Sequence, residues 1–190
     1  MIYQLQYNSP LGLLTLRSDS EALLSIEFPD TELAVGDDVI LLSGDDDSDM
    51  MPSAMQATVG WLDSYFAGAE PEAYPPMKPQ GSPFRQRVWE LLCTIPSGEV
   101  TTYGELARTL AEERGIQRMA AQAVGGAVGA NPIPIIIPCH RVIGTNGSLT
   151  GYGGGVQFKV HLLEHEQFET AHLSWPTLKT QETMDADQAI

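Results

Sequence analysis

The chain of 190 residues is long enough for one ordinary domain or two small ones, and its 43% hydrophobic and 18% charged residues are typical of a soluble globular protein. The formal net charge of −15 argues against long-range attraction to a polyanion, but it is uneven: residues 1–78 carry −12, residues 79–168 carry 0 and residues 169–190 carry −3. With no apolar run of membrane-span length and no basic-then-apolar leader, we expect a cytoplasmic protein without a membrane partner.

Residues 1–68 are predicted to form a small α/β domain. Strands are predicted over 2–7, 13–17 and 22–28. The first two alternate between apolar and polar residues and are separated by turn residues, and the third is rich in apolar residues, as is typical of strands. Apolar residues at steps of three and four predict a helix over 53–67. Between them, the acidic run 44–49 is predicted to be a solvated loop.

Residues 69–81 contain four prolines and are interpreted as an extended linker between two domains. The second domain, residues 82–168, begins with Ser82 as the N-cap of a helix and Pro83 at its first position. Thr102 to Glu105 form a capping box for a second helix. Further helices are expected over 117–128 and 156–166, and residues 169–190 are expected to be a flexible tail.

Two short helices in tandem allow a helix-turn-helix unit, although most helical hairpins bind no DNA. The two cysteines, Cys93 and Cys139, are interpreted as reduced thiols, since no disulfide framework is evident. Neither they nor the four histidines show the paired spacing of a zinc site. We therefore expect no metal and no other cofactor.

Cys139 is the strongest candidate for a reactive group. It follows the apolar run Ile133 to Ile137, which we expect to be extended and buried, and His140 comes directly after it. A thiolate is a good nucleophile near neutral pH if its pKa is lowered, and a histidine with a carboxylate such as Glu166 can withdraw the thiol proton. On residue types alone, Cys139 could equally be an inert core residue and Glu166 an exposed charge.

The motif Pro138-Cys139-His140-Arg141-Val142-Ile143-Gly144 resembles the active-site motif of 6-O-alkylguanine-DNA alkyltransferases, also called methylated-DNA–protein-cysteine methyltransferases. Residues from about 81 to 166 carry further matching blocks in the same order, and residues 1–70 match only loosely. These blocks are Pro83-Phe84, Ile95-Pro96-Ser97-Gly98, Thr102-Tyr103-Gly104-Glu105-Leu106-Ala107, Ala123-Val124-Gly125-Gly126, Asn131-Pro132, Gly151-Tyr152-Gly153-Gly154 and Leu162-Leu163-Glu164-His165-Glu166.

The resemblance implies an α/β + α fold: a small ribonuclease-H-like α/β domain, then a mainly helical domain with a winged-helix-like helix-turn-helix unit. It implies repair of alkylated double-stranded DNA by irreversible, single-turnover transfer of an alkyl group from the 6-oxygen of guanine to Cys139. We also expect a monomer.

The resemblance also assigns roles. His140 would take the thiol proton through a water, Glu166 would orient the imidazole, Asn131 would hold the active-site backbone, and Tyr103 would donate a proton to the leaving guanine. The pocket for the base would be formed by Pro134, Val142, Tyr152, Gly153 and Gly154.

The third helix would enter the minor groove of DNA, which is about 6 Å wide, while the damaged base is flipped out of the stack. Small residues suit that contact. The expected DNA-binding residues are Thr102, Arg118, Ala120, Ala121, Gln122, Ala123, Gly125 and Arg141.

The sequence departs from the family in two places. Gln122 stands where the family usually has an arginine that replaces the flipped base, and we expect Arg118, one helical turn earlier on the same face, to compensate by contacting phosphate. Residues 111–116 make the connection between the second and third helices of this domain about five residues longer than in the family pattern. We expect this to affect how the protein docks on DNA rather than the chemistry of the thiol.

Three other functions stay open at this point. Alkyltransferase-like proteins bind damaged guanine without repairing it, but they lack the motif cysteine. A helix-turn-helix regulator could use Cys139 as a sensor, although it would need a basic docking face. A cysteine hydrolase built on Cys139, His140 and Asn131 would need an oxyanion hole, which no motif specifies.

Overall fold

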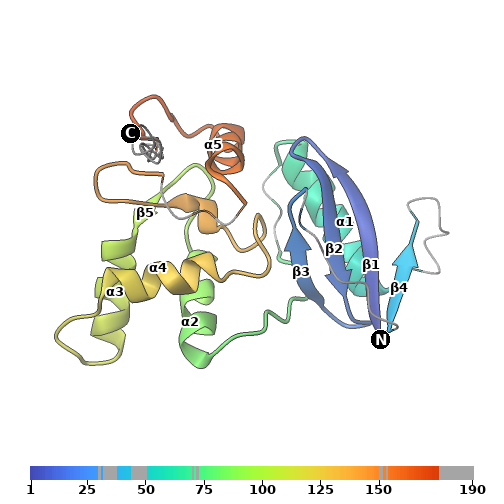
Figure 1. The fold of residues 1–190 in the computed structure, drawn as a ribbon, viewed down its shortest axis with the longest axis horizontal. Helices are drawn as coiled ribbons and strands as arrows, with labels where there is room; N and C mark the ends of the chain where they lie inside the picture. The colour runs from blue at the N-terminus through green and yellow to red at the C-terminus, as the bar shows by residue number, and fades with distance from the viewer. Residues whose placement is uncertain are drawn as a thin grey trace, which may run out of the picture.

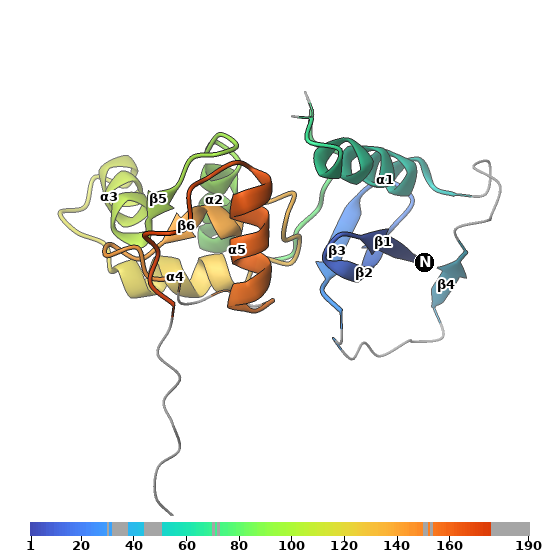
Figure 2. The same cartoon turned by 90° about the horizontal axis from the view of Figure 1, so that it is seen from above.

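The computed structural model describes residues 1–29, 31, 38–43, 51–69, 71, 73–149, 152 and 154–175 (Figure 1). Within these ranges the fold is mixed α/β, with a sheet and one helix in the first part of the chain and four helices in the second. Figures 1 and 2 show the two parts side by side. The acidic run 44–49, the end of the chain from 176 and Gly153 lie outside the described residues.

The first part contains a four-stranded sheet in the order β3-β2-β1-β4. Its strands are β1 (Ile2–Ser9), β2 (Gly12–Ser18), β3 (Leu23–Glu27) and β4 (Val39–Leu42). The first three pair antiparallel and confirm the predicted strands, whereas β4 pairs parallel to β1 and was not predicted. Helix α1 (Ser53–Phe66) lies against the sheet and buries Met55 and Leu62 (Figure 2).

The predicted linker runs along the edge of this sheet. The Leu23 amide donates to the Pro76 carbonyl at 2.8 Å, and the Lys78 amide donates to the Leu23 carbonyl at 2.9 Å. Proline has no amide hydrogen, so it joins a sheet only where its carbonyl is used, as Pro76 does here. The segment therefore fixes the start of the second part against β3.

The second part contains α2 (Pro83–Leu92), α3 (Tyr103–Glu113), α4 (Ala121–Gly129) and α5 (Val156–His165), with β5 (Thr101–Thr102) parallel to β6 (Val142–Ile143). Both predicted caps are confirmed: the Ser82 side chain accepts from the Arg85 amide, and Thr102 and Glu105 form a reciprocal capping box. Helices α2, α3 and α4 pack around a common core. None of the helices in the described ranges is long and apolar enough to cross a membrane.

Two sequence-based expectations are corrected here. The third helix begins at Ala121 rather than at 117, because Ala120 is extended with ψ 125° and the preceding residues form a loop. The run from Ile133 to Ile137 is buried as expected, but it is a tight turn and not an extended segment. The Ile137 amide donates to the Ile133 carbonyl at 2.9 Å, and Ile135 has a φ of 75°.

The predicted tail begins with a packed segment. Leu173 is buried, the Leu149 amide donates to the Ser174 carbonyl at 3.0 Å, and the Ser174 amide donates to the Gly147 carbonyl at 2.9 Å. These bonds hold residues near 174 beside the loop that precedes α5.

The two parts of the chain share a buried interface. The Ile26 amide of β3 donates to the Pro132 carbonyl at 2.9 Å, and the Tyr74 hydroxyl donates to the Cys93 carbonyl at 3.1 Å. Apolar residues from both parts form one continuous core cluster. The sheet is thereby anchored directly to the segment that leads to Cys139.

Candidate active site

Cys139 lies at the start of a single 3-10 turn, η2 (Cys139–Arg141), and the residue is 6% exposed. The preceding turn is held by Asn131, whose side-chain amide donates to the Ile137 carbonyl at 2.8 Å and accepts from the Ile133 amide at 3.0 Å. Because Asn131 clamps both ends of this turn, it sets where the backbone delivers the thiol.

The thiol opens onto a cavity of about 250 Å³, close to the lower end of the range for small-molecule pockets. Both parts of the chain line it: Ile26, Glu27, Phe28, Thr31, Val128, Gly129, Asn131, Pro134, Cys139, Tyr152 and Gly154. Of the residues predicted for the pocket, Pro134, Tyr152 and Gly154 are here. Val142 is fully buried and is not among the residues that line the cavity.

Burial raises the pKa of the Cys139 thiol, and a hydrogen bond from Asn131 and the charge of Lys159 only partly offset this. The thiol is therefore protonated at rest, so the resting site does not supply the lowered pKa that a thiolate nucleophile needs. The physical reason is desolvation, since a thiolate buried among apolar residues loses its hydration. A neighbouring base must take the proton when the thiol reacts.

His140 is suited to be that base. Its Nε2 lies 2.7 Å from Oε1 of Glu166, and because an ionised carboxylate only accepts, Nε2 carries the hydrogen. Nδ1 is then an unprotonated acceptor, and it has no hydrogen-bond partner among the described residues. Burial lowers the pKa of His140 although Glu166 opposes this, so the imidazole is neutral at neutral pH.

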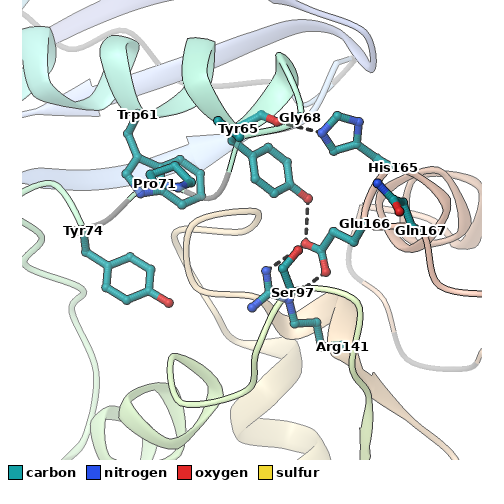
Figure 3. Close-up of a pocket in the computed structure, with 11 residues that line it drawn as sticks. Trp61, Tyr65, Gly68, Pro71, Tyr74, Ser97, Arg141, His165, Glu166 and Gln167 are labelled. Atoms are coloured by element: carbon teal, nitrogen blue, oxygen red, sulfur yellow. Dashed lines mark hydrogen bonds and ion pairs between the residues drawn. The ribbon is translucent and has the colours of Figure 1, made fainter.

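Glu166, at the end of α5, gathers donors from three further residues, of which Tyr65 and Arg141 are drawn in Figure 3. Arg141 donates from Nε at 2.8 Å to Oε2 and from Nη2 at 2.9 Å to Oε1, the Tyr65 hydroxyl donates to Oε1 at 2.8 Å, and the Gly98 amide donates to Oε2 at 3.3 Å. Burial raises the pKa of Glu166, but hydrogen bonds and charges from His140 and Arg141 outweigh it and hold the pKa below its usual range.

The turn that contains Gly98 needs a glycine. Gly98 has a φ of +77°, and a Cβ there would lie 2.9 Å from the Glu166 carbonyl oxygen. Glycine is the residue that adopts this conformation and allows this approach without a clash. The Pro96-Ser97-Gly98 turn thus brings a backbone donor to the carboxylate.

Arg141 does not lie at a DNA-facing surface, where we expected it. It is 8% exposed, and its guanidinium donates to Glu166 and to the Ile95 carbonyl. A guanidinium used in this way is unavailable to phosphate, so the expectation that Arg141 contacts DNA is corrected. A buried carboxylate needs such a paired cation.

Among the residues that sequence reasoning missed, two interact with the charged groups of the site. Lys159 is fully buried on α5, donates from Nζ to the Val142 carbonyl at 2.6 Å and interacts with Cys139; burial lowers its pKa to about 8. Its position three residues after the inward-facing Val156 could have indicated an inward lysine. Tyr65 had no such local signal, because 101 residues separate it from Glu166.

Two tyrosines interact with Cys139. Tyr103 begins α3 and packs near Gly125, where a Cβ would lie 3.7 Å from the ring. Burial raises the pKa of Tyr103 and the charge of Cys139 adds to it, so its phenol stays a donor. Tyr152 packs edge-on against Phe28 with centroids 5.8 Å apart, and burial and Cys139 both raise the pKa of its phenol.

The residues predicted to contact DNA, Arg141 aside, are mostly at the surface around the start of α4. Ala120, Ala121, Gln122 and Ala123 are exposed, and Gly125 is half-buried. Arg118 is exposed but precedes the helix, so the expectation that it shares a helical face with Gln122 is wrong. The side chain of Thr102 is engaged in the cap of α3. Within the described ranges, no group of three or more His, Cys, Asp and Glu side chains is arranged to hold a metal ion.

Comparisons with known proteins identify the family. Residues 83–168 match the family model "6-O-methylguanine DNA methyltransferase, DNA binding domain". A methylated-DNA–protein-cysteine methyltransferase of Haemophilus influenzae is 39% identical over 168 residues, which cover 87% of each protein, and one of Mycobacterium bovis is 41% identical over 88% of this chain and 93% of its own. The crystal structure of Mycobacterium tuberculosis OGT in complex with DNA matches with a TM-score of 0.70 and 38% identity over 90% of this chain and 94% of that one.

Proposed function

Since this chain belongs to the methylated-DNA–protein-cysteine methyltransferase family, we propose that it repairs DNA by moving an alkyl group from the 6-oxygen of guanine to Cys139. One observation supports this most directly: a buried thiol lines a cavity, and the next residue in the chain is a neutral histidine with an unprotonated ring nitrogen. No cofactor enters the scheme.

The reaction begins when the damaged base leaves the stack and enters the cavity, which costs a few kcal/mol of stacking and pairing. His140 accepts the thiol proton at Nδ1, directly or through a water, and Glu166 holds the imidazole in that tautomer. Lys159 favours the thiolate by its charge. Sulfur attacks the alkyl carbon, a carbon–sulfur bond forms and the carbon–oxygen bond to guanine breaks.

Proton balance requires that guanine regain one proton as it leaves. Tyr103 donates it, and His140 then passes the proton it took from the thiol back to Tyr103 through solvent, so the net change moves the thiol proton to guanine. The thioether that remains is stable, and none of these residues can return it to a thiol. The protein is therefore a reagent that acts once.

We also propose that the sheet and α1 form a ribonuclease-H-like domain, and that α3 and α4 form a winged-helix-like helix-turn-helix unit. Helix α4 would lie in the minor groove with its small residues Ala121 and Ala123 against DNA, and Gln122 would occupy the place of the flipped base. The Mycobacterium tuberculosis relative was crystallised in complex with DNA, which supports DNA as the partner of this chain. The cytoplasmic location and the monomeric state stay predictions.

Mass spectrometry tests the proposal. After incubation with a duplex that carries one 6-O-methylguanine, we expect intact protein to gain one methyl group in place of a hydrogen. Cys139→Ser should abolish the gain, whereas the matched change Cys93→Ser should leave it. Binding without any gain in mass would point instead to a damage sensor and would overturn the proposal.

A further inference from the structure

Tyr65 links the N-terminal part of the chain to the acid–base network of the thiol. It lies on α1, its side chain is buried, and its hydroxyl donates to Oε1 of Glu166 at 2.8 Å (Figure 3). The same oxygen accepts from His140 Nε2 at 2.7 Å. One carboxylate oxygen thus joins a tyrosine of the first part to the histidine beside Cys139.

We propose that Tyr65 is a positioning residue for alkyl transfer: its hydroxyl holds Glu166 in place and draws charge from it, which keeps His140 neutral and oriented. The inference rests on the proposed function and deepens it. It makes the α/β part of the chain a contributor to the chemistry.

The position of Tyr65 is itself fixed from several sides. Its ring stacks on Trp61 with centroids 5.3 Å apart and lies 4.9 Å from the His165 ring. Its carbonyl accepts from His165 Nε2 at 2.7 Å, so α1 and α5 are joined at both the backbone and the hydroxyl of one residue. A donor held this firmly can restrict the carboxylate it contacts.

Water is a poor substitute for this hydroxyl. Tyr65, Arg141 and Glu166 line the same cavity (Figure 3). The cavity has a volume of about 290 Å³, yet the Glu166 side chain is only 1% exposed. A carboxylate with so little contact with solvent depends on protein donors for its hydrogen bonds. Loss of the hydroxyl would therefore concentrate negative charge on Oε1.

The direction of the effect follows from the groups around His140. Glu166 raises the pKa of His140, whereas Arg141 and Lys159 lower it, and burial lowers it most. Cys139 adjoins it in the chain, and Tyr152 interacts with both Glu166 and Tyr65. Removal of the Tyr65 donor strengthens the influence of Glu166, so His140 would become protonated at a higher pH and would lose its function as a base there.

The test is the pH profile of single-turnover transfer from a duplex with one 6-O-methylguanine, measured from pH 5 to 9 with protein in excess. For Tyr65→Phe we expect the acid limb to move up by roughly half a pH unit and the plateau rate to fall roughly tenfold. Tyr7→Phe is the matched control, because Tyr7 donates to the carboxylate of Asp63, also on α1, but away from the site. A Tyr65→Phe profile that coincides with that of Tyr7→Phe would overturn the inference.

A second variant guards against a folding defect. 3-Fluorotyrosine at position 65 keeps the shape of the ring and makes the phenol a stronger donor, so the acid limb should move to lower pH. An unchanged limb in this well-folded protein would also contradict a positioning role. Absence of transfer by the unaltered protein would refute the proposed function itself, which separates the two failures.

Discussion

The thiol site and the DNA-facing surface are fixed by the chain to very different degrees. At the thiol site, the buried Glu166 carboxylate receives donors from four residues in three segments that lie far apart in the sequence. At the start of α4, Ala120 provides no side-chain cap, and Gln122 is exposed. The chemistry is therefore determined by a buried network, whereas docking on DNA depends on separate surface residues. Substitutions at these surface residues should each have a small effect on DNA binding, and the effects should be nearly additive.

The largest effect should come from breaking the network at its centre. Glu166→Gln removes the negative charge that pairs with Arg141 and orients His140, so we expect a loss of about 3–5 kcal/mol in the free energy of unfolding. The single-turnover rate should fall by about a hundredfold or more. Urea unfolding and rapid-quench transfer measure the two.

Glu164→Gln is the control for this change, because Glu164 is exposed on the same helix. If both substitutions had equal effects, the contrast between a rigid buried site and a tolerant surface would be lost.

A smaller effect is expected from Lys159. Its pKa is lowered to about 8, so its positive charge is present below that pH and is lost as the pH rises through it. Thiolate stabilisation weakens accordingly, and the transfer rate should decline above pH 8. Lys159→Met should lower the rate near pH 7 by about tenfold and abolish the decline. A decline that persists in the variant would mean that another group titrates there.

The smallest effect is expected at the surface. Arg118→Ala should weaken binding to undamaged duplex DNA by several-fold and reduce the slope of log affinity against log salt by about one, as for one lost phosphate contact. Lys78→Ala is the control, since Lys78 is an exposed cation in the N-terminal part. An unchanged slope would remove Arg118 from the docking surface and leave residue Gln122 without the proposed compensation.

Local features of this fold were predictable from the sequence, because their causes lie within a few residues. The caps at Ser82 and Thr102 and the first three strands depend on neighbouring side chains. Strand β4 was missed because it is short and its ladder partner, β1, lies more than thirty residues earlier. The start of α4 was misplaced because apolar periodicity continues into the loop before Ala121.

The site was predictable as a set of residue types but not as an arrangement. The cysteine motif brought Cys139, His140 and Glu166 together through family resemblance. The burial of Arg141 could not be inferred, because a cation after the motif looks the same in the sequence whether it faces phosphate or an internal carboxylate. The contact between Tyr65 and Glu166 depends on how the two parts of the chain pack, and no local pattern encodes it.

The burial of Cys139 affects how stable the unreacted protein is before it encounters alkylated DNA. Peroxide and small electrophiles react with exposed thiolate, whereas Cys139 is a buried residue whose thiol has its pKa raised by desolvation. The half-buried Cys93, with its pKa raised to about 11, is also a poor target. A molecule that can react only once is thereby protected from accidental oxidation, so the thiol of each molecule stays reactive until it meets alkylated DNA.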